Sequence, residues 1–299
     1  MRSQLEQALE LVRDDRPESL DQALNLLQNT VYSFSMKVCG HVEDAEDTAQ
    51  DVLLKSLPHL AKFENPKALT VWIYKVARNH CVSNRRGLKN SASSHLSLDE
   101  LMPSSQELKG LMENPALSPE AALLNNESAE QLKRAIMAVP PQYRMVLVLH
   151  DMEELSTAEV AQILGLREGT VRVRLHRARL LVRQELAKAA NAQVPGTHVI
   201  HAAAEPARPG RCRHLFAQLS DYMDGVIDEA ICDEMKRHIS DCEPCQAFLS
   251  SLQDAVGRCR AYRPAMDSER AEQMRRELHL QYAKALSALR EREATTLRP

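Results

Sequence analysis

Aromatic residues, glycine and long apolar runs are all scarce in this sequence. Aromatic side chains make up 4% of the 299 residues, and there are 9 glycines, so little of the chain has the composition of packed strands and tight turns. The longest apolar runs, such as MVLVL at 145–149, are far shorter than the roughly 20 residues of a membrane span. The first residues, MRSQLEQALE, lack the apolar core of a signal peptide. We therefore expect a cytoplasmic protein without membrane contact.

What the sequence has in quantity is helix-forming residues. Hydrophobic residues make up 44% of the chain, and Leu, Ala, Glu, Gln and Arg recur at spacings of three and four. The length favours two or three domains. The seven cysteines are an odd number and include a CxxC pair, which favours metal or thiol chemistry over a disulfide framework. We predict an all-α protein of several domains.

Two segments of different composition divide the helical parts. Residues 89–130 are rich in Ser, Asn and Pro and carry seven acidic residues against two lysines, which predicts a mostly unstructured acidic linker. Residues 189–210 contain repeated Ala, Pro and Gly and predict a second, flexible linker. The remaining segments are predicted to be two helical domains, a small third domain and a C-terminal amphipathic helix, at 18–88, 131–188, 211–262 and 264–299. The apolar stripe of the last helix needs a partner and consists of Ala271, Met274, Leu278, Tyr282, Ala285 and Leu289.

The stretch 155–186 has the features of a helix-turn-helix. Ser156 followed by Glu159 predicts a capping box at the start of a helix, and Gly165 is expected to end that helix. A second helix should begin about three residues later, as in DNA-binding helix-turn-helix units. It carries six arginines and one acidic residue within 17 positions, and arginine suits guanine edges and phosphate. The residues expected to pack against the first helix are Val171, Val173, Leu175, Ala178 and Leu181.

These motifs carry a family resemblance. The run AVPPQYRMVLVLHDMEELSTAEVAQILGLREGTVRVRLHRAR resembles domain 4 of the extracytoplasmic-function sigma factors, a branch of the sigma-70 family, and residues 18–86 resemble domain 2. DAEDTAQDVLLKSL, at 44–57, is similar to the helix with which that family docks on the clamp of RNA polymerase. VWIYKVARN, at 71–79, is similar to the helix that reads and opens the −10 promoter element. The resemblance implies a sigma factor that binds core RNA polymerase and promoter DNA and has no catalytic site.

The resemblance also assigns roles to individual residues. It implies polymerase contacts for Asp44, Asp47, Gln50 and Asp51. It implies −10 DNA contacts for Phe63, Asn65, Lys67, Lys75, Arg78, Asn79, Arg85 and Arg86, and −35 contacts for Thr170, Arg172, Arg174, Arg177 and Arg179. Trp72 is expected in the core, because a lone tryptophan on a helix is more often packed than free for base stacking. Ser83 stands where the family usually has an acidic residue, and the basic run Arg85–Arg86 is short for the family.

The run HISDCEPC, at 238–245, predicts a metal site. His238, Cys242 and Cys245 are spaced four and three residues apart, and nitrogen and sulfur donors suit tetrahedral zinc. The fourth ligand is expected to be Cys212, with His214 as the alternative. The segment resembles the zinc-binding anti-sigma domain. The family pattern LSxYxDG is closely matched by LSDYMDG, at 219–225. That resemblance implies one zinc ion and an intramolecular contact between the zinc domain and the sigma domains.

Two alternatives remain open from the sequence. The zinc domain either regulates the sigma domains in cis, in response to metal or redox state, or serves as a structural or recruiting module. The rival to the sigma-factor interpretation is a standalone metal- or redox-responsive helix-turn-helix regulator that uses no polymerase. The clamp-like segment at 44–57 favours the sigma factor.

Overall fold

The computed structural model describes residues 2–13, 17–56, 59–60, 63, 65–84, 101–103, 107, 112, 126–192, 210–278 and 280. Within these residues the chain forms helices and no strands, so the all-α prediction is confirmed. No helix in this part of the chain is long and apolar enough to cross a membrane. The chain divides into two compact units. The first comprises 1–91, 162–165 and 263–299, and the second comprises 92–161 and 166–262.

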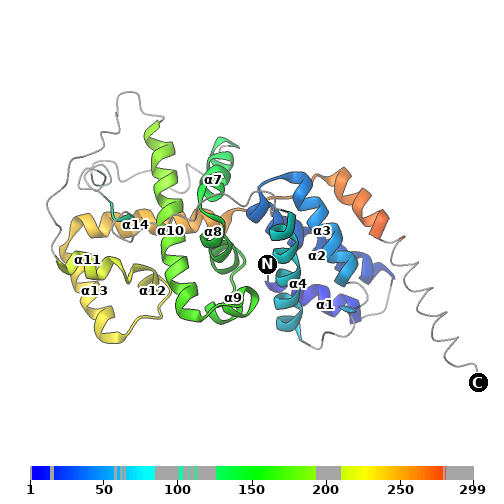
Figure 1. The fold of residues 1–299 in the computed structure, drawn as a ribbon, viewed down its shortest axis with the longest axis horizontal. Helices are drawn as coiled ribbons and strands as arrows, with labels where there is room; N and C mark the ends of the chain where they lie inside the picture. The colour runs from blue at the N-terminus through cyan, green and yellow to red at the C-terminus, as the bar shows by residue number, and fades with distance from the viewer. Residues whose placement is uncertain are drawn as a thin grey trace, which may run out of the picture. The chain divides into compact units, whose positions relative to one another are not determined.

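The first unit is built on a group of helices from the N-terminal part of the chain (Figure 1). Its helices are α1 (Arg2–Arg13), α2 (Pro17–Cys39), α3 (Val42–Ser56) and α4 (Pro66–Asn84). Their apolar faces form a core in which the rings of Phe34 and Tyr74 meet edge to face, with centroids 4.9 Å apart. Helix α4 begins where it does because the side-chain oxygen of Asn65 accepts a hydrogen bond from the backbone N–H of Ala68, at 2.8 Å.

A segment from the far end of the chain belongs to this same unit. Asp267 caps it by accepting hydrogen bonds from the backbone N–H groups of Glu269 and Arg270, and residues 268–278 are helical. Gln28 of α2 donates a hydrogen bond to the carbonyl oxygen of Ala271, at 3.0 Å. The apolar stripe of this C-terminal helical segment is buried as far as it is described, at Ala271, Met274 and Leu278. The other predicted stripe residues, Tyr282, Ala285 and Leu289, lie outside the described residues.

The second unit contains the basic helix and the cysteine-containing segment. It begins with α7 (Asn126–Ala138), α8 (Pro141–Leu147) and a π-helical turn, η4 (Val148–Met152). The long helix α10 (Glu168–Ala192) contacts α7 and α8, and on other sides it contacts α12 (Leu219–Met223) and α14 (Glu243–Ala261). The remaining helices of the cysteine-containing segment are α11 (Gly210–Phe216) and α13 (Glu229–Asp241).

The predicted helix-turn-helix is confirmed in its local geometry. Ser156 and Glu159 form the capping box of α9 (Thr157–Leu164): the Glu159 carboxylate accepts from the Ser156 N–H at 2.9 Å, and the Ser156 hydroxyl accepts from the Glu159 N–H at 3.3 Å. Gly165 has a φ of 66°, the left-handed conformation that ends a helix at little cost for glycine. Helix α10 begins three residues later.

One expectation about packing is wrong. Val173 was expected in the core of α10 but is 55% exposed, because it lies on the opposite helical face from the buried Val171, Leu175 and Ala178. Within the predicted acidic linker, which stays a prediction, the structure describes a few apolar residues. Leu101 and Pro103 are buried, and Met102 and Pro103 line a small apolar cavity of the cysteine-containing segment. The composition of the whole segment does not predict this contact with the cavity, because only two apolar side chains, Met102 and Pro103, make it.

Two glycines of the helix-turn-helix are expected to respond oppositely to alanine. A Cβ atom meets nothing within 4 Å at either Gly165 or Gly169, so backbone conformation alone decides the outcome. Gly165→Ala should destabilise the protein by about 1 kcal/mol because of its positive φ, and Gly169→Ala, inside the first turn of α10, should stabilise it by about 0.5–1 kcal/mol. Urea unfolding of both variants measures the difference. Equal effects would contradict this account of the turn.

Candidate metal centre and nucleic-acid interface

Three helices bring four candidate metal ligands together. Cys212 lies in α11, His238 in the last turn of α13, and Cys245 in the first turn of α14. Cys242 lies between α13 and α14 in an extended conformation, with φ of −124° and ψ of 92°. Pro244 stands in the first turn of α14, where a missing N–H costs nothing, so the chain turns sharply and Cys245 returns to the side of His238.

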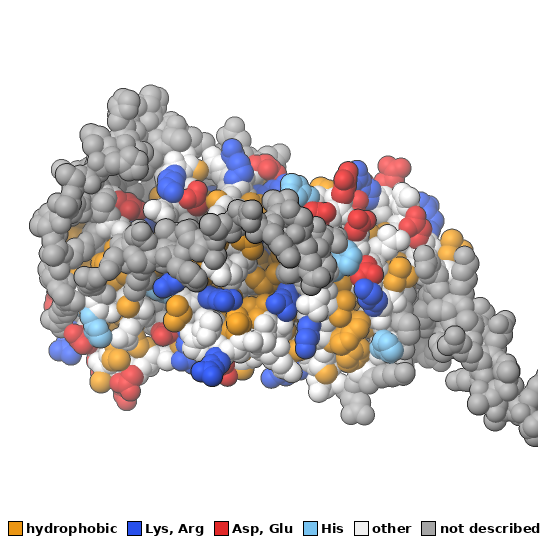
Figure 2. All heavy atoms as spheres, viewed as in Figure 1, with side chains coloured by type: hydrophobic (Ala, Val, Ile, Leu, Met, Phe, Trp, Pro, Cys, Tyr) orange, Lys and Arg blue, Asp and Glu red, His pale blue; other side chains and the backbone are white. Residues whose placement is uncertain are grey.

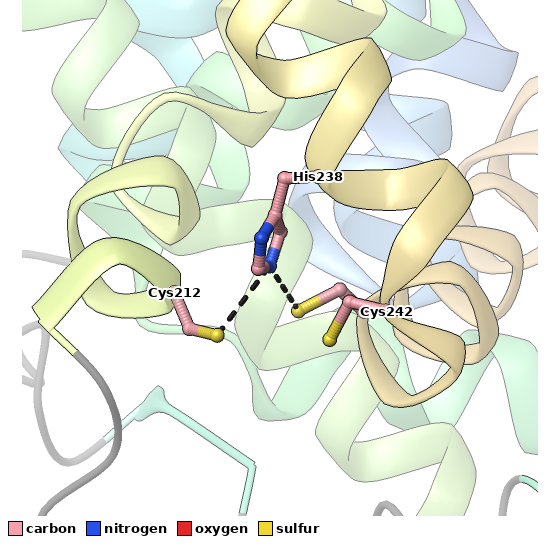
Figure 3. Close-up of side chains that lie close together, drawn as sticks. Cys212, His238 and Cys242 are labelled. Atoms are coloured by element: carbon pink, nitrogen blue, oxygen red, sulfur yellow. Dashed lines mark hydrogen bonds between the residues drawn. The ribbon is translucent and has the colours of Figure 1, made fainter.

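The candidate ligand atoms are close enough for one ion. One donor atom from each of Cys212, His238, Cys242 and Cys245 lies within 4.8 Å of all the others. The Nε2 atom of His238 is 3.4 Å from the Cys212 sulfur (Figure 3). The same atom is 3.2 Å from the Cys245 sulfur. His214, the alternative fourth ligand, is exposed and lies beside Gln218 instead. Of the two candidates for the fourth ligand, Cys212 is the one that lies beside His238, Cys242 and Cys245.

The electrostatics of this cluster fit a cation. Burial raises the pKa of the Cys245 thiol strongly, and the neighbouring Cys242 and Cys212 raise it further. Several thiolates in one half-buried site repel one another unless a positive ion lies between them. Three sulfurs and one imidazole nitrogen form a donor set that zinc prefers in closed, four-coordinate structural sites.

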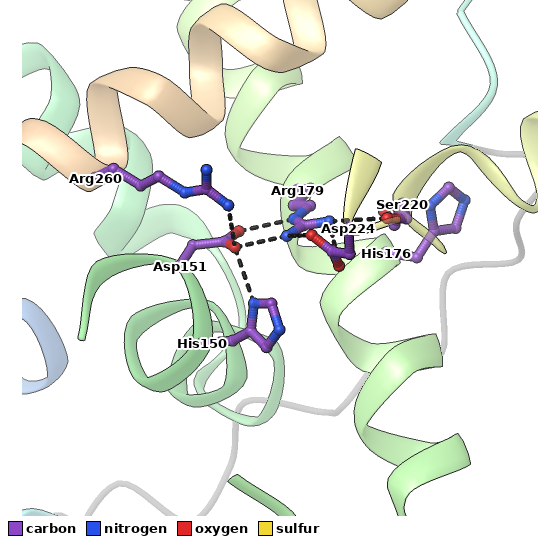
Figure 4. A network of polar contacts seen from close by, with 7 residues as sticks. All are labelled: His150, Asp151, His176, Arg179, Ser220, Asp224 and Arg260. Carbon is purple, nitrogen blue, oxygen red and sulfur yellow. Dashed lines mark hydrogen bonds and ion pairs between the residues drawn. The ribbon is translucent and has the colours of Figure 1, made fainter. Parts of the chain in front are cut away.

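A second polar cluster lies where α12 meets α10. The guanidinium of Arg179 is fully buried and donates to both oxygens of Asp151, at 2.6 and 2.7 Å, and to both oxygens of Asp224, at 2.7 and 3.0 Å (Figure 4). It also donates to the carbonyl oxygen of Ser220, at 3.3 Å. We call Asp151, Arg179, Ser220 and Asp224 the Arg179 cluster. A buried guanidinium requires such pairing, since removing it from water is otherwise very costly.

The two sides of the Arg179 cluster come from different parts of the sequence. Asp151 lies in the π-helical turn, whose extra residue per turn alters the direction of its side chains relative to an α-helix. Although burial alone would raise the pKa of Asp151, hydrogen bonds from Arg179 and His150 hold it far below the usual range. Asp224 lies in the turn after α12, before Gly225 with its φ of 67°. The carboxylates from both segments are therefore paired with Arg179.

Further contacts attach the cysteine-containing segment to α10. The Nδ1 atom of His176 lies 2.9 Å from the Ser220 hydroxyl. Burial raises the pKa of Asp221, and the nearby positive charge of Arg172 opposes that rise. Arg183 donates to the Ser251 hydroxyl at 2.7 Å, pairs with Glu107 at 2.7 Å, and stacks over the Phe248 ring at 4.1 Å. These contacts cover one side of α10 along several turns.

The predicted −35 contact residues therefore lie in different environments. Thr170 and Arg172 are exposed, and Arg174 and Arg177 are half-buried, with Arg177 donating to the Tyr143 hydroxyl at 3.3 Å. Arg179 is buried in its cluster, so its predicted DNA contact would require α12 to move away. All five remain predictions.

The predicted polymerase contacts lie on α3. Asp47 is exposed, and Asp44, Gln50 and Asp51 are half-buried. Asp51 pairs with Lys55 at 2.6 Å, and Gln50 donates to Glu277 of the C-terminal helical segment at 3.2 Å. Acidic and basic side chains lie intermixed over α3 and this segment (Figure 2).

The predicted −10 contacts lie on and before α4. Lys67, Lys75 and Asn79 are exposed and Arg78 is half-buried, whereas Asn65 uses its side-chain oxygen to cap the helix. The half-buried Trp72 packs against the Phe63 ring, with centroids 5.8 Å apart. Arg85 and Arg86 lie outside the described residues.

Three stretches of the chain match known families. Residues 24–90 match the family described as Sigma-70 region 2, and residues 129–182 match that described as Sigma-70, region 4. Residues 212–246, which contain the four candidate ligands, match the family described as "Putative zinc-finger". The two sigma matches correspond to the helices of the first unit and to the helix-turn-helix.

Several sigma factors are similar over nearly their whole length. ECF RNA polymerase sigma factor SigW of Bacillus subtilis is 24% identical over 186 residues, which cover 62% of this chain and 98% of SigW. RNA polymerase sigma factor YlaC of the same species is 28% identical over 172 residues, or 57% of this chain and 94% of YlaC. The ECF RNA polymerase sigma-E factor of Escherichia coli is 29% identical over 185 residues, or 58% and 92%.

The chain therefore contains regions 2 and 4 of the sigma-70 family, and the relatives that it matches are RNA polymerase sigma factors. More narrowly, its relatives are ECF sigma factors, and it carries a zinc-finger-like domain in addition to the two sigma regions. The resemblance read from the motifs is confirmed.

The sequence did not identify four of the residues that make the polar contacts between α10 and the segments packed against it. These are Asp151, His176, Ser220 and Asp224. Asp224 belongs to the LSDYMDG pattern, which was interpreted only as part of a family motif. The arginine excess of α10 is the one sequence feature that indicates such contacts. A buried arginine needs a carboxylate beside it, so a basic helix that is partly buried predicts acidic residues on the segments that cover it.

The contact of His176 predicts a pH dependence. Burial, with the charges of Arg179 and Arg177, lowers the pKa of His176 from 6.5 to about 4. The folded state therefore disfavours protonation, so the stability present above pH 6.5 is lost as pH falls toward 4, by about 2 kcal/mol at pH 5. We expect urea unfolding of the intact protein to show this loss between pH 7.5 and 5.

The matched variant is His176→Asn, in which the loss should be smaller by that amount. The two proteins differ only at residue 176, so the difference between their pH profiles isolates His176. An identical pH profile for the two would contradict a buried, neutral His176.

Proposed function

We propose that this chain directs promoter-specific transcription initiation by core RNA polymerase, and that its zinc-finger-like domain binds one zinc ion and restrains this activity in cis. The first part rests on the two sigma regions and on relatives that are ECF sigma factors. The observation that carries the second part is the Arg179 cluster, in which the zinc-finger-like domain holds an arginine of the DNA-reading helix.

Contacts on α10 support a restraint of −35 recognition. Asp224 and Ser220 bind Arg179, and Asp221 lies near Arg172, so carboxylates of the zinc-finger-like domain neutralise arginines proposed to meet DNA. Phosphate and guanine contacts need those same guanidinium groups. DNA and the zinc-finger-like domain would therefore compete for one side of the helix.

Contacts in the first unit support a second restraint, on polymerase docking. The C-terminal helical segment lies against α2 and α3. Arg270 pairs with Glu46 at 2.9 Å, Arg275 donates to the side-chain oxygen of Asn25 at 2.7 Å, and Gln50 donates to Glu277. Gln50 and its neighbours on α3 are the residues proposed to meet the polymerase clamp. A polymerase bound there would have to displace the segment.

Transcription with purified components tests the sigma function. Core RNA polymerase with the chain truncated after residue 192 should initiate at a specific promoter, and core polymerase alone should not. Promoter fragments selected for binding by the reconstituted holoenzyme supply the template. DNA binding without any polymerase-dependent initiation would favour a standalone helix-turn-helix regulator instead.

Removing the carboxylates that face α10 should release activity. We expect Asp221→Asn combined with Asp224→Asn in the full chain to raise promoter-specific transcription at least about threefold, because Arg172 and Arg179 then lose the carboxylates that the zinc-finger-like domain holds beside them. The matched control, Asp233→Asn, removes a carboxylate of α13 that pairs only weakly with Lys236, at 3.6 Å, and should change nothing. Unchanged activity of the double variant would refute the restraint and leave the sigma function standing.

The metal site gives a separate prediction. Cys242→Ser and Cys245→Ser should lose the zinc ion and unfold the zinc-finger-like domain, because a structural zinc site contributes folding energy directly. Cys232→Ser, on α13 but outside the cluster, should keep one zinc per chain by elemental analysis. If both ligand variants retain full zinc, the ligands lie elsewhere.

A further inference from the structure

Two cysteines outside the metal cluster lie against each other in the first unit. The sulfur atoms of Cys39 and Cys81 are 2.8 Å apart, less than 1 Å longer than the roughly 2.05 Å bond of a disulfide. Both are reduced and buried, each 2% exposed, and 42 positions of sequence separate them. Neither belongs to a family motif identified above, and neither is near a candidate zinc ligand in sequence.

The positions of the two cysteines in their helices allow access. Cys39 is the last residue of α2, followed by Gly40 with a φ of 78°, and Cys81 lies in the last turn of α4, which ends at Asn84. Terminal turns open locally far more often than helix centres, so a small oxidant can reach thiols that are buried on average. The pair needs no unfolding of the core to react.

We propose that Cys39 and Cys81 form a reversible disulfide when the protein meets a hydroperoxide. One thiol attacks the peroxide, breaking the O–O bond and releasing an alcohol or water as the sulfur becomes a sulfenic acid. The second thiol then attacks that sulfur, which expels water and forms the S–S bond. Two thiols thus lose two electrons and two protons, and a dithiol reductant reverses the change.

The disulfide would fasten two functional helices together. Helix α4 carries the proposed −10 contacts Lys75, Arg78 and Asn79 within two turns of Cys81, and α2 carries the surface on which the C-terminal helical segment lies. Thr48 of α3 approaches both the Cys81 sulfur, at 3.7 Å, and the Nδ1 atom of His80, at 3.0 Å. The covalent bond therefore forms where the polymerase-facing and promoter-reading helices of the domain meet.

Peptide mapping of the intact, zinc-loaded protein tests the proposal. After treatment with hydrogen peroxide in native buffer and blocking of free thiols, trypsin should yield the peptides 38–55 and 79–85 joined by one disulfide. The joined peptides should separate after dithiothreitol. Closing a loop of this length should also raise the melting temperature of the first unit by at least about 5 °C, reversibly.

Cys39→Ser and Cys81→Ala serve as independent variants, and both should lose the peroxide-dependent rise in melting temperature. Cys259→Ser is the matched control, since Cys259 is equally buried and lies in α14, and it should keep the rise. Peptides 38–55 and 79–85 that stay separate while the half-exposed Cys232 is oxidised would overturn the proposal. So would a link that appears only in urea.

Discussion

The buried charge of Arg179 is the interaction on which the second unit depends. An arginine side chain with no exposure to water must have its charge balanced nearby, and here Asp151 from one side and Asp224 from the other both contribute. Removing either carboxylate would leave a charge only partly compensated. The region 4 helices and the zinc-finger-like domain are consequently coupled through a side chain of α10, the helix that we propose reads DNA.

The sequence predicted best the structural features that depend on residues close together in the chain. The capping box at Ser156, the turn at Gly165 and the cluster of His238, Cys242 and Cys245 all follow from spacings of three to five residues. Local backbone geometry alone decides those features. Cys212, and not His214, joins the other three residues of the cluster because its helix packs back on them, which spacing alone could not establish.

What sequence reasoning missed depends on contacts between distant segments. The burial of Arg179, the meeting of Cys39 with Cys81, and the docking of Met102 and Pro103 each join residues far apart in the chain. The π-helical turn at 148–152 is likewise invisible in a hydrophobic pattern that resembles an ordinary helix. The apolar stripe of the C-terminal segment was correctly identified, but an amphipathic pattern does not specify which surface will cover it.

Holding the DNA-reading helix and the segment that covers it in one polypeptide has a consequence for how the protein responds to its own abundance. A separate inhibitor restrains its target according to the ratio in which the two are made. Here that ratio is one in every molecule, and tethering makes the closed state an intramolecular equilibrium. Under the proposed restraint, the fraction of open molecules is independent of expression level and of dilution. Transcription would then rise in proportion to the number of protein molecules. Only a change in the contact between the zinc-finger-like domain and α10 would alter the activity of each molecule.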